Sequence, residues 1–380
     1  MIIGISREIA DGEKRVAINP ESAAKLIELF DAEVRIEPNA GVLSGYDDSL
    51  YREIGARIAD GREEIFRDSD LILSVDAPPD DNLRQMKRGS VLICFLWALQ
   101  NPERVELLKE LEITALGLDT VPRISRAQTM DALSSMSNIA GYKSVLIGAG
   151  ELDRYLPMMM TAAGTIPPAK VLVLGAGVAG LQAIATARRL GAVVEAYDIR
   201  PAVKEQVESL GARFVEVPAV DQDTETEGGY AKEISELQKE KQLEVMHKHV
   251  RKSDIVITTA LIPGKKAPLL VPASMVEVMK AGSVIVDLAA EQGGNCELTR
   301  AGETVVHNGV KIIGPLNLPS SLAHHASQLY SKNLLSLLTL LEEEKQLNFN
   351  FEDEIILKTT VTHRGEIISP MLKENDAGLA

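Results

Sequence analysis

Residues 170–180 read Lys-Val-Leu-Val-Leu-Gly-Ala-Gly-Val-Ala-Gly, an apolar run followed by three closely spaced glycines. The run Lys170 to Leu174 is typical of a buried strand, and a helical pattern follows the glycines. A second apolar run, Val193 to Tyr197, ends at Asp198, 23 residues after Gly175. Strand, glycine turn, helix, strand and acid in this order predict one βαβ unit of a doubly wound α/β sheet.

The three glycines have distinct uses at such a turn. Gly175 would form the tight turn, Gly177 would let the backbone approach a pyrophosphate, and Gly180 would let the helix pack closely on the strand. Asp198 can accept hydrogen bonds from the ribose hydroxyls of adenosine and would repel a 2′-phosphate, which favours NAD over NADP. Arg200 could accommodate that phosphate, so NADP stays open as the alternative. A structural turn followed by a surface acid is the other interpretation.

Strand and helix patterns alternate through the rest of the chain. Apolar runs at 2–6, 33–37, 71–75, 91–95 and 113–116 alternate with helical patterns, without a glycine-rich phosphate loop. Further strands are expected at 254–258, 283–287 and 310–313, a long amphipathic helix at 319–341, and weak strands at 354–357 and 359–362. We expect two doubly wound, Rossmann-like α/β domains with mostly parallel sheets joined by long helices. Residues 1–125 plus 330–380 would form the first domain, and residues 126–329 the NAD-binding domain.

Composition excludes several functional classes. The 40 basic and 55 acidic residues give a formal charge of −15, which repels phosphate backbones and argues against nucleic acid as a partner. Cys94 and Cys296 lack His or Cys neighbours at ligand spacing, so neither a disulfide framework nor a structural metal is expected. The most apolar run, Val91 to Leu99, is about half the length of a membrane-spanning helix, and the first residues lack a signal-peptide pattern. We therefore expect a cytoplasmic protein without a membrane span.

Segment 122–138, Pro-Arg-Ile-Ser-Arg-Ala-Gln-Thr-Met-Asp-Ala-Leu-Ser-Ser-Met-Ser-Asn, is dense in hydrogen-bonding side chains. Asp131, Ser134 and Asn138 recur at helical spacing and would share one face of a helix. On a helix between two domains, that face would offer a nicotinamide carboxamide and ribose fixed donors and acceptors. A solvated stripe, with Ser125 and Gln128 as a capping box, explains the same spacing.

Other features have both a bland and a functional interpretation. Pro218 to Tyr230 is acidic, flanked by glycines and poor in apolar residues, which suits either a plain surface loop or a mobile lid that carries Tyr230 over the site. Asp287 and Glu291 follow an expected strand on the cofactor edge and would either contact the dinucleotide or satisfy a turn. His324-His325 point about 100° apart on a helix, so surface histidines are expected rather than a shared metal.

Longer motifs connect the sequence with a known family. It resembles the NAD(H)-binding component, domain I or the α1 subunit, of proton-translocating NAD(P) transhydrogenases over nearly its whole length. The resemblance rests on segment 122–135 together with Gly12-Glu-Lys-Arg-Val-Ala, Asn138-Ile-Ala-Gly-Tyr, Met160-Thr-Ala-Ala-Gly-Thr, Gly175-Ala-Gly-Val-Ala-Gly-Leu-Gln-Ala, Gly228-Gly-Tyr-Ala-Lys and Thr258-Thr-Ala-Leu-Ile-Pro-Gly-Lys. The wider superfamily includes the alanine dehydrogenases.

The resemblance implies a Si-Re specific, proton-translocating NAD(P)+ transhydrogenase in which this subunit holds NAD(H). A domain III subunit would hold NADP(H) as co-substrate and a domain II subunit would span the membrane, as separate polypeptides. It further implies a homodimer on the cytoplasmic face of the inner membrane, and no metal. Arg123, Gln128, Asp131 and Ser134 would orient the nicotinamide end, and Tyr230 would close over NAD(H). The remaining dinucleotide contacts would come from Gly175, Gly177, Val178, Ala179, Gly180, Asp198, Ile199, Arg200, Thr259, Ala260 and Leu261.

Hydride transfer between two nicotinamide rings forms no alkoxide or amine, so it requires positioning rather than a general acid or base. By the same resemblance, alanine dehydrogenases bind and protonate a keto acid with a lysine and a histidine, where this chain has Asp76 and Trp97 and retains Arg15. Aspartate would repel a carboxylate and indole offers no proton, which disfavours an alanine dehydrogenase-like oxidoreductase. That enzyme remains the alternative, and a catalytically silent NAD-sensing module is a third hypothesis.

Overall fold

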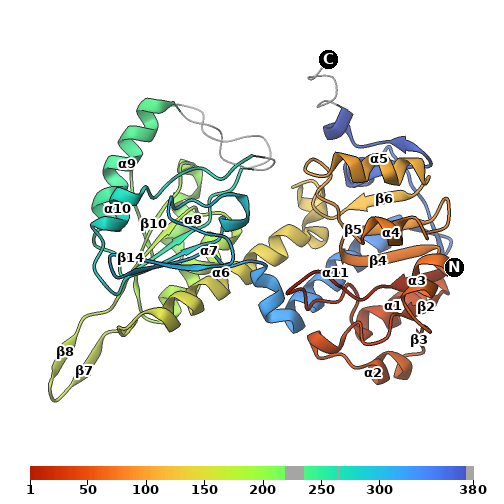
Figure 1. Ribbon diagram of the computed structural model, residues 1–380, viewed down its shortest axis with the longest axis horizontal. Helices are drawn as coiled ribbons and strands as arrows, with labels where there is room; N and C mark the ends of the chain where they lie inside the picture. Colours follow the sequence, from red (N-terminus) through yellow and green to blue (C-terminus); the bar gives the residue numbers. More distant parts are fainter. Residues whose placement is uncertain (219–234, 263–264, 374–380) are drawn as a thin grey trace. The chain divides into compact units, whose positions relative to one another are not determined.

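A computed structural model describes residues 1–218, 235–262 and 265–373 (Figure 1). The chain divides into two compact units, Met1–Met136 with Pro319–Ala380, and Ser137–Leu318. Each unit contains one mostly parallel sheet with helices packed against it. This architecture confirms the predicted fold class of two Rossmann-like α/β sheets.

The first unit is built on an eight-stranded sheet of order β19-β18-β6-β5-β4-β1-β2-β3. Its parallel strands are β1 (Ile2–Ile5), β2 (Glu33–Ile36), β3 (Arg57–Ile58), β4 (Leu71–Asp76), β5 (Val91–Phe95) and β6 (Thr114–Gly117). The antiparallel strands β18 (Thr360–His363) and β19 (Glu366–Ile367) extend it beyond β6. Its main helices are α1 (Pro20–Phe30), α2 (Asp48–Glu53), α3 (Arg62–Asp68), α4 (Asp80–Leu83), α5 (Pro102–Glu110), α11 (Ala323–Leu341) and α12 (Glu354–Thr359). Strand β1 lies between β2 and β4, so the strand order reverses there.

The second unit has a seven-stranded sheet of order β11-β10-β9-β12-β13-β15-β14. The strands are β9 (Lys170–Leu174), β10 (Val193–Tyr197), β11 (Arg213–Phe214), β12 (Ile255–Thr258), β13 (Val284–Asp287), β14 (Thr304–His307) and β15 (Val310–Ile313), and β14 alone among them is antiparallel to its neighbour. Its helices include α7 (Val178–Arg189), α8 (Lys204–Ser209), α9 (Glu236–Val250) and α10 (Ala273–Glu277). The strand order reverses at β9, which lies between β10 and β12.

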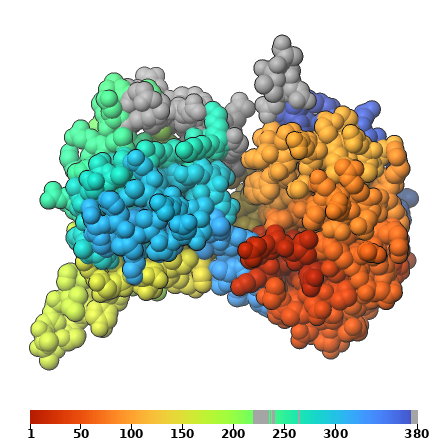
Figure 2. All heavy atoms as spheres, in the orientation of Figure 1, coloured from red at the N-terminus to blue at the C-terminus, as the bar shows by residue number. Residues whose placement is uncertain are grey.

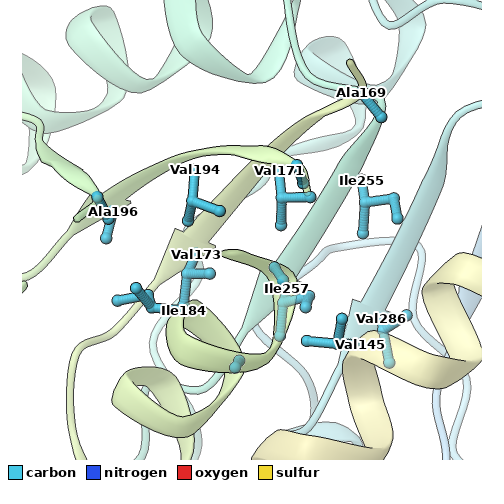
Figure 3. Packing of buried hydrophobic residues seen from close by; sticks show 14 of the residues in the cluster. Val145, Ala169, Val171, Val173, Ile184, Val194, Ala196, Ile255, Ile257 and Val286 are labelled. Carbon is cyan, nitrogen blue, oxygen red and sulfur yellow. The ribbon is translucent and has the colours of Figure 1, made fainter. Parts of the chain in front are cut away.

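Alternate residues of β9 are buried on opposite faces of this sheet. Val171 and Val173 belong to a cluster with Ile184 of α7 (Figure 3). Leu172 and Leu174 belong to a second cluster, which includes residues of α9 and α10. Because a strand's side chains alternate between faces and both faces are covered, the strand reads in sequence as a continuous apolar run.

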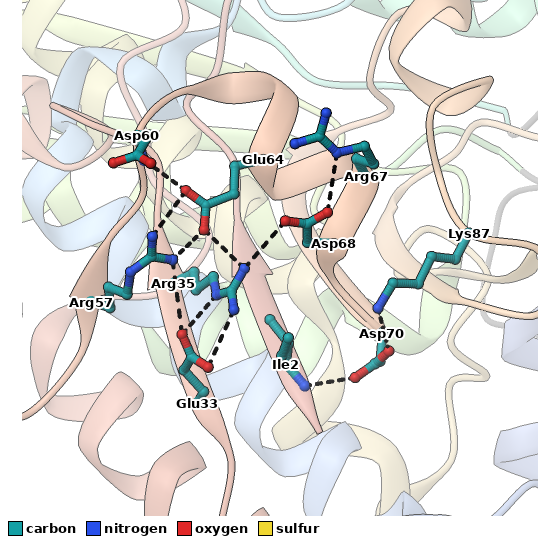
Figure 4. A network of polar contacts seen from close by, with 10 residues as sticks. All are labelled: Ile2, Glu33, Arg35, Arg57, Asp60, Glu64, Arg67, Asp68, Asp70 and Lys87. Carbon is teal, nitrogen blue, oxygen red and sulfur yellow. Dashed lines mark hydrogen bonds and ion pairs between the residues drawn. The ribbon is translucent and has the colours of Figure 1, made fainter.

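Charged side chains cover the β2–β3 edge of the first sheet (Figure 4). The guanidinium of Arg35 lies 2.8 Å from both Glu33 and Glu64, and Arg57 also pairs with Glu64. An open groove of about 850 Å³ is lined by this network and its neighbours. Charged residues on an edge strand oppose pairing with a second sheet, and the paired arginines give this groove a structural explanation.

The long polar and helical segment between the sheets contains two helices. A 3₁₀ helix, η2 (Ser125–Met130), is followed by α6 (Ala132–Glu151). Gly141 lies within α6 because a Cβ there would stand 2.1 Å from the carbonyl oxygen of Ala179, and Gly148 similarly meets Ile255. These glycines therefore permit close packing and do not end the helix.

Two elements near the C-terminus and one hairpin differ from expectation. The weak strand predicted at 354–357 is wrong, because the Asp353 carboxylate accepts the backbone N–H of Ile355 at 2.8 Å and caps the helix α12. The helix predicted from 319 begins as a 3₁₀ turn, η5 (Leu318–Leu322). The hairpin of β7 (Met159–Thr161) and β8 (Gly164–Ile166), which the sequence patterns did not reveal, projects from the second unit (Figure 2).

Candidate functional site

The glycine turn lies where the strand order of the second sheet reverses, at the carboxyl end of β9. Gly175 has a φ of +102°, and a Cβ there would lie 2.5 Å from Oγ1 of Thr259. A Cβ on Gly180 would lie 1.9 Å from the carbonyl oxygen of Gly175, so α7 can approach the strand only with glycine at this position. A Cβ on Gly177 would meet nothing within 4 Å. Gly177 thus leaves open space above the turn, which fits a ligand that approaches the backbone there.

The first turn of α7 faces the same space. Gly177 is the N-cap, and no side chain caps the helix. Val178 and Ala179 begin the helix, so their backbone N–H groups belong to the terminus that lacks partners within the helix. The positive end of the helix dipole adds to these donors. This arrangement suits an anion such as a pyrophosphate.

Asp198 joins the glycine turn to the residues that follow β10. Its Oδ2 accepts the N–H of Ala176 at 2.7 Å, and its Oδ1 accepts the N–H of Arg200 at 2.9 Å. The Arg200 guanidinium grips both carboxylate oxygens, from Nε at 2.9 Å and from Nη2 at 2.8 Å. Both side chains are largely buried, with 6% of Asp198 and 13% of Arg200 exposed. The cation that sequence reasoning offered to a 2′-phosphate is therefore already bound to the acid that would repel one, and Ile199 lies between them in sequence.

The segment after β12 forms the other side of this edge. Oγ1 of Thr259 donates to the carbonyl of Gly175 at 3.1 Å, which ties the segment to the glycine turn. The fully buried Asn295 accepts the N–H of Ala260 at 3.0 Å and donates to its carbonyl at 2.9 Å. Leu261 is 39% exposed. Sequence reasoning missed Asn295 as a positioning residue, although it noted the turn Gln292-Gly-Gly-Asn that contains it.

The structure settles the role of Asp287 between its two interpretations. Its Oδ1 accepts from Thr258 Oγ1 at 2.8 Å and from the N–H of Ala289 at 3.0 Å. Its Oδ2 accepts from the N–H of Cys296 at 3.0 Å and from Thr299 Oγ1 at 2.6 Å. The carboxylate is fully buried and satisfied by protein groups, so Asp287 holds the turn. Burial also raises the pKa of the Cys296 thiol to about 11, which keeps the thiol neutral and poorly nucleophilic.

In the first unit, η2 is fixed from several sides. Asn333 of α11 donates to the carbonyl of Thr129 at 2.8 Å, and Arg126 forms a bidentate pair with Asp353. Arg123 and Gln128 lie on the exposed side of this segment. A backbone held by buried contacts can thus present polar side chains outward.

Asp131 caps α6 instead of belonging to a solvated stripe. It accepts the N–H of Ser134 at 2.8 Å on Oδ1 and the Ser134 hydroxyl at 2.5 Å on Oδ2. The capping box expected from Ser125 and Gln128 is wrong, because the residue before η2 makes no capping bond through its side chain. Asn138 donates to Gln182 of α7 at 3.0 Å within the second unit. Tyr230 and residues 219–229 lie outside the described residues.

The residues that bear on keto-acid chemistry are also engaged. The buried Arg15 guanidinium is held by both carboxylate oxygens of Glu13, at 2.8 and 2.6 Å. Trp97 has a φ of +49°, stacks on Phe95 and is 40% exposed. Asp119 fixes this backbone by accepting the N–H of Trp97 at 3.1 Å. The indole thus stands at the end of β5 without a titratable proton.

Both halves of the chain match models of known protein families. Models of the alanine dehydrogenase/PNT family match it twice, the N-terminal domain at residues 4–140 and the C-terminal domain at residues 144–370. The chain belongs to the alanine dehydrogenase/PNT family.

Relatives from both branches of the alanine dehydrogenase/PNT family resemble this chain. An NAD(P) transhydrogenase alpha subunit of Rhodospirillum rubrum is 51% identical over 380 residues, covering 98% of this chain and 99% of that relative. Alanine dehydrogenase 2 of Staphylococcus aureus (strain Mu50) is 31% identical over 331 residues, covering 85% and 82%. A solved transhydrogenase from Sinorhizobium meliloti is 44% identical with a TM-score of 0.87, covering 97% of this chain and 100% of that chain. Among the described residues, no helix combines the length and apolar character needed to cross a bilayer.

Proposed function

We propose that this chain is the NAD(H)-binding component of a proton-translocating NAD(P) transhydrogenase. The observation that carries the proposal is the 51% identity to a transhydrogenase alpha subunit across nearly the full length of both chains. The open space above Gly177 and the α7 terminus independently support a dinucleotide site. When bound, NADH supplies the hydride that NADP+ on a partner subunit accepts.

Each part of the second unit would then have one task. Gly175, Gly177 and Gly180 shape the turn, and the N–H groups of Val178 and Ala179 face the pyrophosphate. Asp198 accepts the ribose hydroxyls, and Ile199 and Arg200 border them. Thr259, Ala260 and Leu261 line the opposite side of the edge, where Asn295 fixes the backbone of Ala260.

Selectivity for NAD(H) would rest on the Asp198–Arg200 pair acting together. A free arginine beside a ribose attracts a 2′-phosphate, whereas an arginine gripped through Nε and Nη2 has its charge largely compensated. A phosphate would also have to approach the Asp198 carboxylate. The pair therefore excludes NADP(H) both by repulsion and by withholding its cation.

The nicotinamide end would be oriented by Arg123, Gln128, Asp131 and Ser134, with Tyr230 closing over it. The exposed position of Gln128 on a fixed η2 backbone supports a role that demands reach and orientation. Since hydride transfer between two rings needs alignment and no proton transfer at carbon, such residues act through position. The neutral buried thiol of Cys296 and the paired Arg15 agree with this absence of acid–base chemistry.

We propose domain III and domain II subunits as partners, and a location on the cytoplasmic face of the inner membrane. A homodimer is supported by the β7–β8 hairpin, on which Met160 is 73% and Ile166 is 44% exposed. Apolar side chains on a projecting hairpin favour burial against another chain.

Alanine dehydrogenase activity is the competing function, and one assay separates the two. The purified chain with NAD+ and a panel of L-amino acids should produce no NADH, whereas addition of an NADP-binding partner subunit should start transfer between NADH and an NADP+ analogue. Amino-acid turnover by the chain alone contradicts the proposal. NADH binding without transfer in the presence of a competent partner would instead indicate the NAD-sensing module.

Gln128→Asn tests the nicotinamide assignment within the same assay. The amide remains but its reach shortens by one methylene, so transfer should fall by about 10- to 100-fold while NADH affinity changes less than about twofold. Gln100→Asn provides a control, since Gln100 is exposed and lies outside the proposed site. Normal transfer by Gln128→Asn removes Gln128 from the site.

A further inference from the structure

The first unit contains a cavity of about 250 Å³ that has no part in the proposed dinucleotide site. Its polar lining consists of Ser6, Arg7, Glu8, Arg62, Ser74 and Asp76. These residues follow β1, begin α3 or belong to the last residues of strand β4, at the pair where the strand order of this sheet reverses. The carboxyl ends of strands at such a reversal are where open α/β sheets bind ligands.

Glu8 is the carboxylate in this cavity without a cationic partner among the described residues. It accepts the N–H of Val75 at 2.6 Å and, weakly, that of Asp76 at 3.4 Å. Burial raises the pKa of Glu8 to about 8, and the negative charges of Asp76 and Glu13 add to the shift. The site therefore carries a negative charge that the protein itself does not compensate.

The arginines nearby are engaged with other acids. Arg15 is held by Glu13 through two hydrogen bonds. Arg62 donates to Glu37 at 3.0 Å and to the carbonyl of Arg7 at 2.8 Å. The Arg7 side chain is half exposed and 3.8 Å from Glu37. Bound in this way, the guanidinium groups leave the charge of Glu8 to be met by something else.

A second, independent observation concerns Ser74. Its side chain lines the cavity and is 99% buried, yet within the described residues its hydroxyl lacks a hydrogen bond of ordinary geometry and has only the weakly polar thiol of Cys94 beside it. A buried hydroxyl without a partner costs about 1–3 kcal/mol. A hydrogen-bond donor placed in the cavity would remove that cost.

We propose that this cavity binds a small primary ammonium compound, with the Glu8 carboxylate as counter-ion and the Ser74 hydroxyl as acceptor of one of its N–H bonds. An ammonium group offers three donors on a compact charge, which matches a carboxylate and a hydroxyl on one wall. The cavity exceeds the ~150 Å³ that holds benzene, so roughly six to ten heavy atoms fit. Pro78 and Pro79 on its rim provide apolar contact for a short carbon chain.

Binding should be linked to ionisation of Glu8. The charged and titratable groups that face Glu8 are Asp76 of β4, Glu13 and Arg15 after β1, Arg7, Arg62 of α3, Cys94 of β5 and Tyr330 of α11. Burial raises the pKa of Cys94 and of Tyr330, so both stay neutral near pH 7. Because the ammonium favours ionised Glu8, affinity should rise by up to about tenfold per pH unit below pH 8.

Isothermal titration of the full-length chain tests the proposal, with 1,4-diaminobutane as the probe and uncharged 1,4-butanediol as its shape control. The diamine should bind saturably and the diol should not. L-alanine, which adds a carboxylate to the ammonium, should bind at least about tenfold more weakly than the diamine. Failure of the diamine to bind, or equal binding of the diol, overturns the proposal.

Variants assign the site. Glu8→Gln should weaken diamine binding by at least about tenfold and abolish its pH dependence, while Asp81→Asn, an exposed acid outside the cavity lining, should change neither. Ser74→Ala should weaken it by a smaller factor, about fivefold. Thermal unfolding of each variant checks that it folds. Unchanged binding by folded Glu8→Gln refutes the assignment. NADH titration of the same variants should stay normal, which separates this inference from the proposed function.

Discussion

Asp198→Asn tests the proposed basis of NAD(H) selectivity at the residue where the structure is most specific. Asparagine keeps the size of the side chain but replaces one carboxylate oxygen with an NH₂ donor. In the native arrangement both oxygens accept, from Ala176 and from the backbone and guanidinium of Arg200. The variant therefore sets a donor against a donor and leaves the Arg200 cation, 13% exposed, without its counter-charge.

The contacts give two magnitudes. Loss of a carboxylate that accepts charged hydrogen bonds in a largely buried pair should lower the free energy of unfolding by about 2–4 kcal/mol. Loss of a charged acceptor for the ribose hydroxyls should weaken NADH by about 1.5–3 kcal/mol, or roughly 10- to 100-fold. Release of Arg200 and removal of the repulsion should strengthen NADPH. The ratio of NADH to NADPH affinity should therefore fall by at least about 100-fold.

Fluorescence titration with each nucleotide and urea unfolding measure both effects on one preparation. The double variant Asp198→Asn, Arg200→Gln separates them, because it removes the orphaned cation. It should regain part of the lost stability and lose the gained NADPH affinity, while NADH remains weak. If Asp198→Asn unfolds more easily but keeps the wild-type nucleotide ratio within about twofold, the pair is structural only and the selectivity argument is wrong.

Three further predictions concern the turn, the edge and the buried acid. Gly180→Ala should lower the free energy of unfolding in urea by about 3 kcal/mol or more, whereas Gly177→Ala should change it by less than about 1 kcal/mol and weaken NADH; equal stabilities contradict the packing argument. Asn295→Ala should cost about 2–3 kcal/mol and also weaken NADH, and unaltered urea midpoint and affinity would deny it a positioning role. Burial raises the pKa of Glu8 to about 8 in the folded chain, so its contribution to stability is present in acid and is lost as pH rises toward 8. Glu8→Gln should remove about 3 kcal/mol of that decline between pH 5 and 8, measured by urea unfolding, and a slope like the wild type refutes it.

Local patterns predicted much of the second sheet. The strand over 310–313 occurs at the residues expected, and β9, the glycine turn and β10 follow in the predicted order. These features depend on alternation of buried side chains and on backbone freedom at glycine, both of which are written in consecutive residues. The error at 354–357 arose because one capping acid, Asp353, outweighed a short apolar pattern.

The candidate site was predicted less completely, since its side chains interact across long sequence separations. Sequence could not choose between two roles for Asp287, whose partner Thr258 lies 29 residues away. Nor could it find Asn295, which fixes Ala260 35 residues upstream. Such hydrogen bonds exist only after neighbouring strands align, so no spacing rule within one segment reveals them.

The sequence by itself determined the fold class, the family and the position of a dinucleotide turn, because helix and strand periods and three spaced glycines are local constraints on the backbone. Only the tertiary structure decided that Arg200 is bound by Asp198, that Asp287 is satisfied by protein groups, and that Glu8 lacks a counter-charge in a cavity beside Ser74. Charge compensation and burial depend on which distant groups meet within a few ångströms, and that is a property of the folded chain alone.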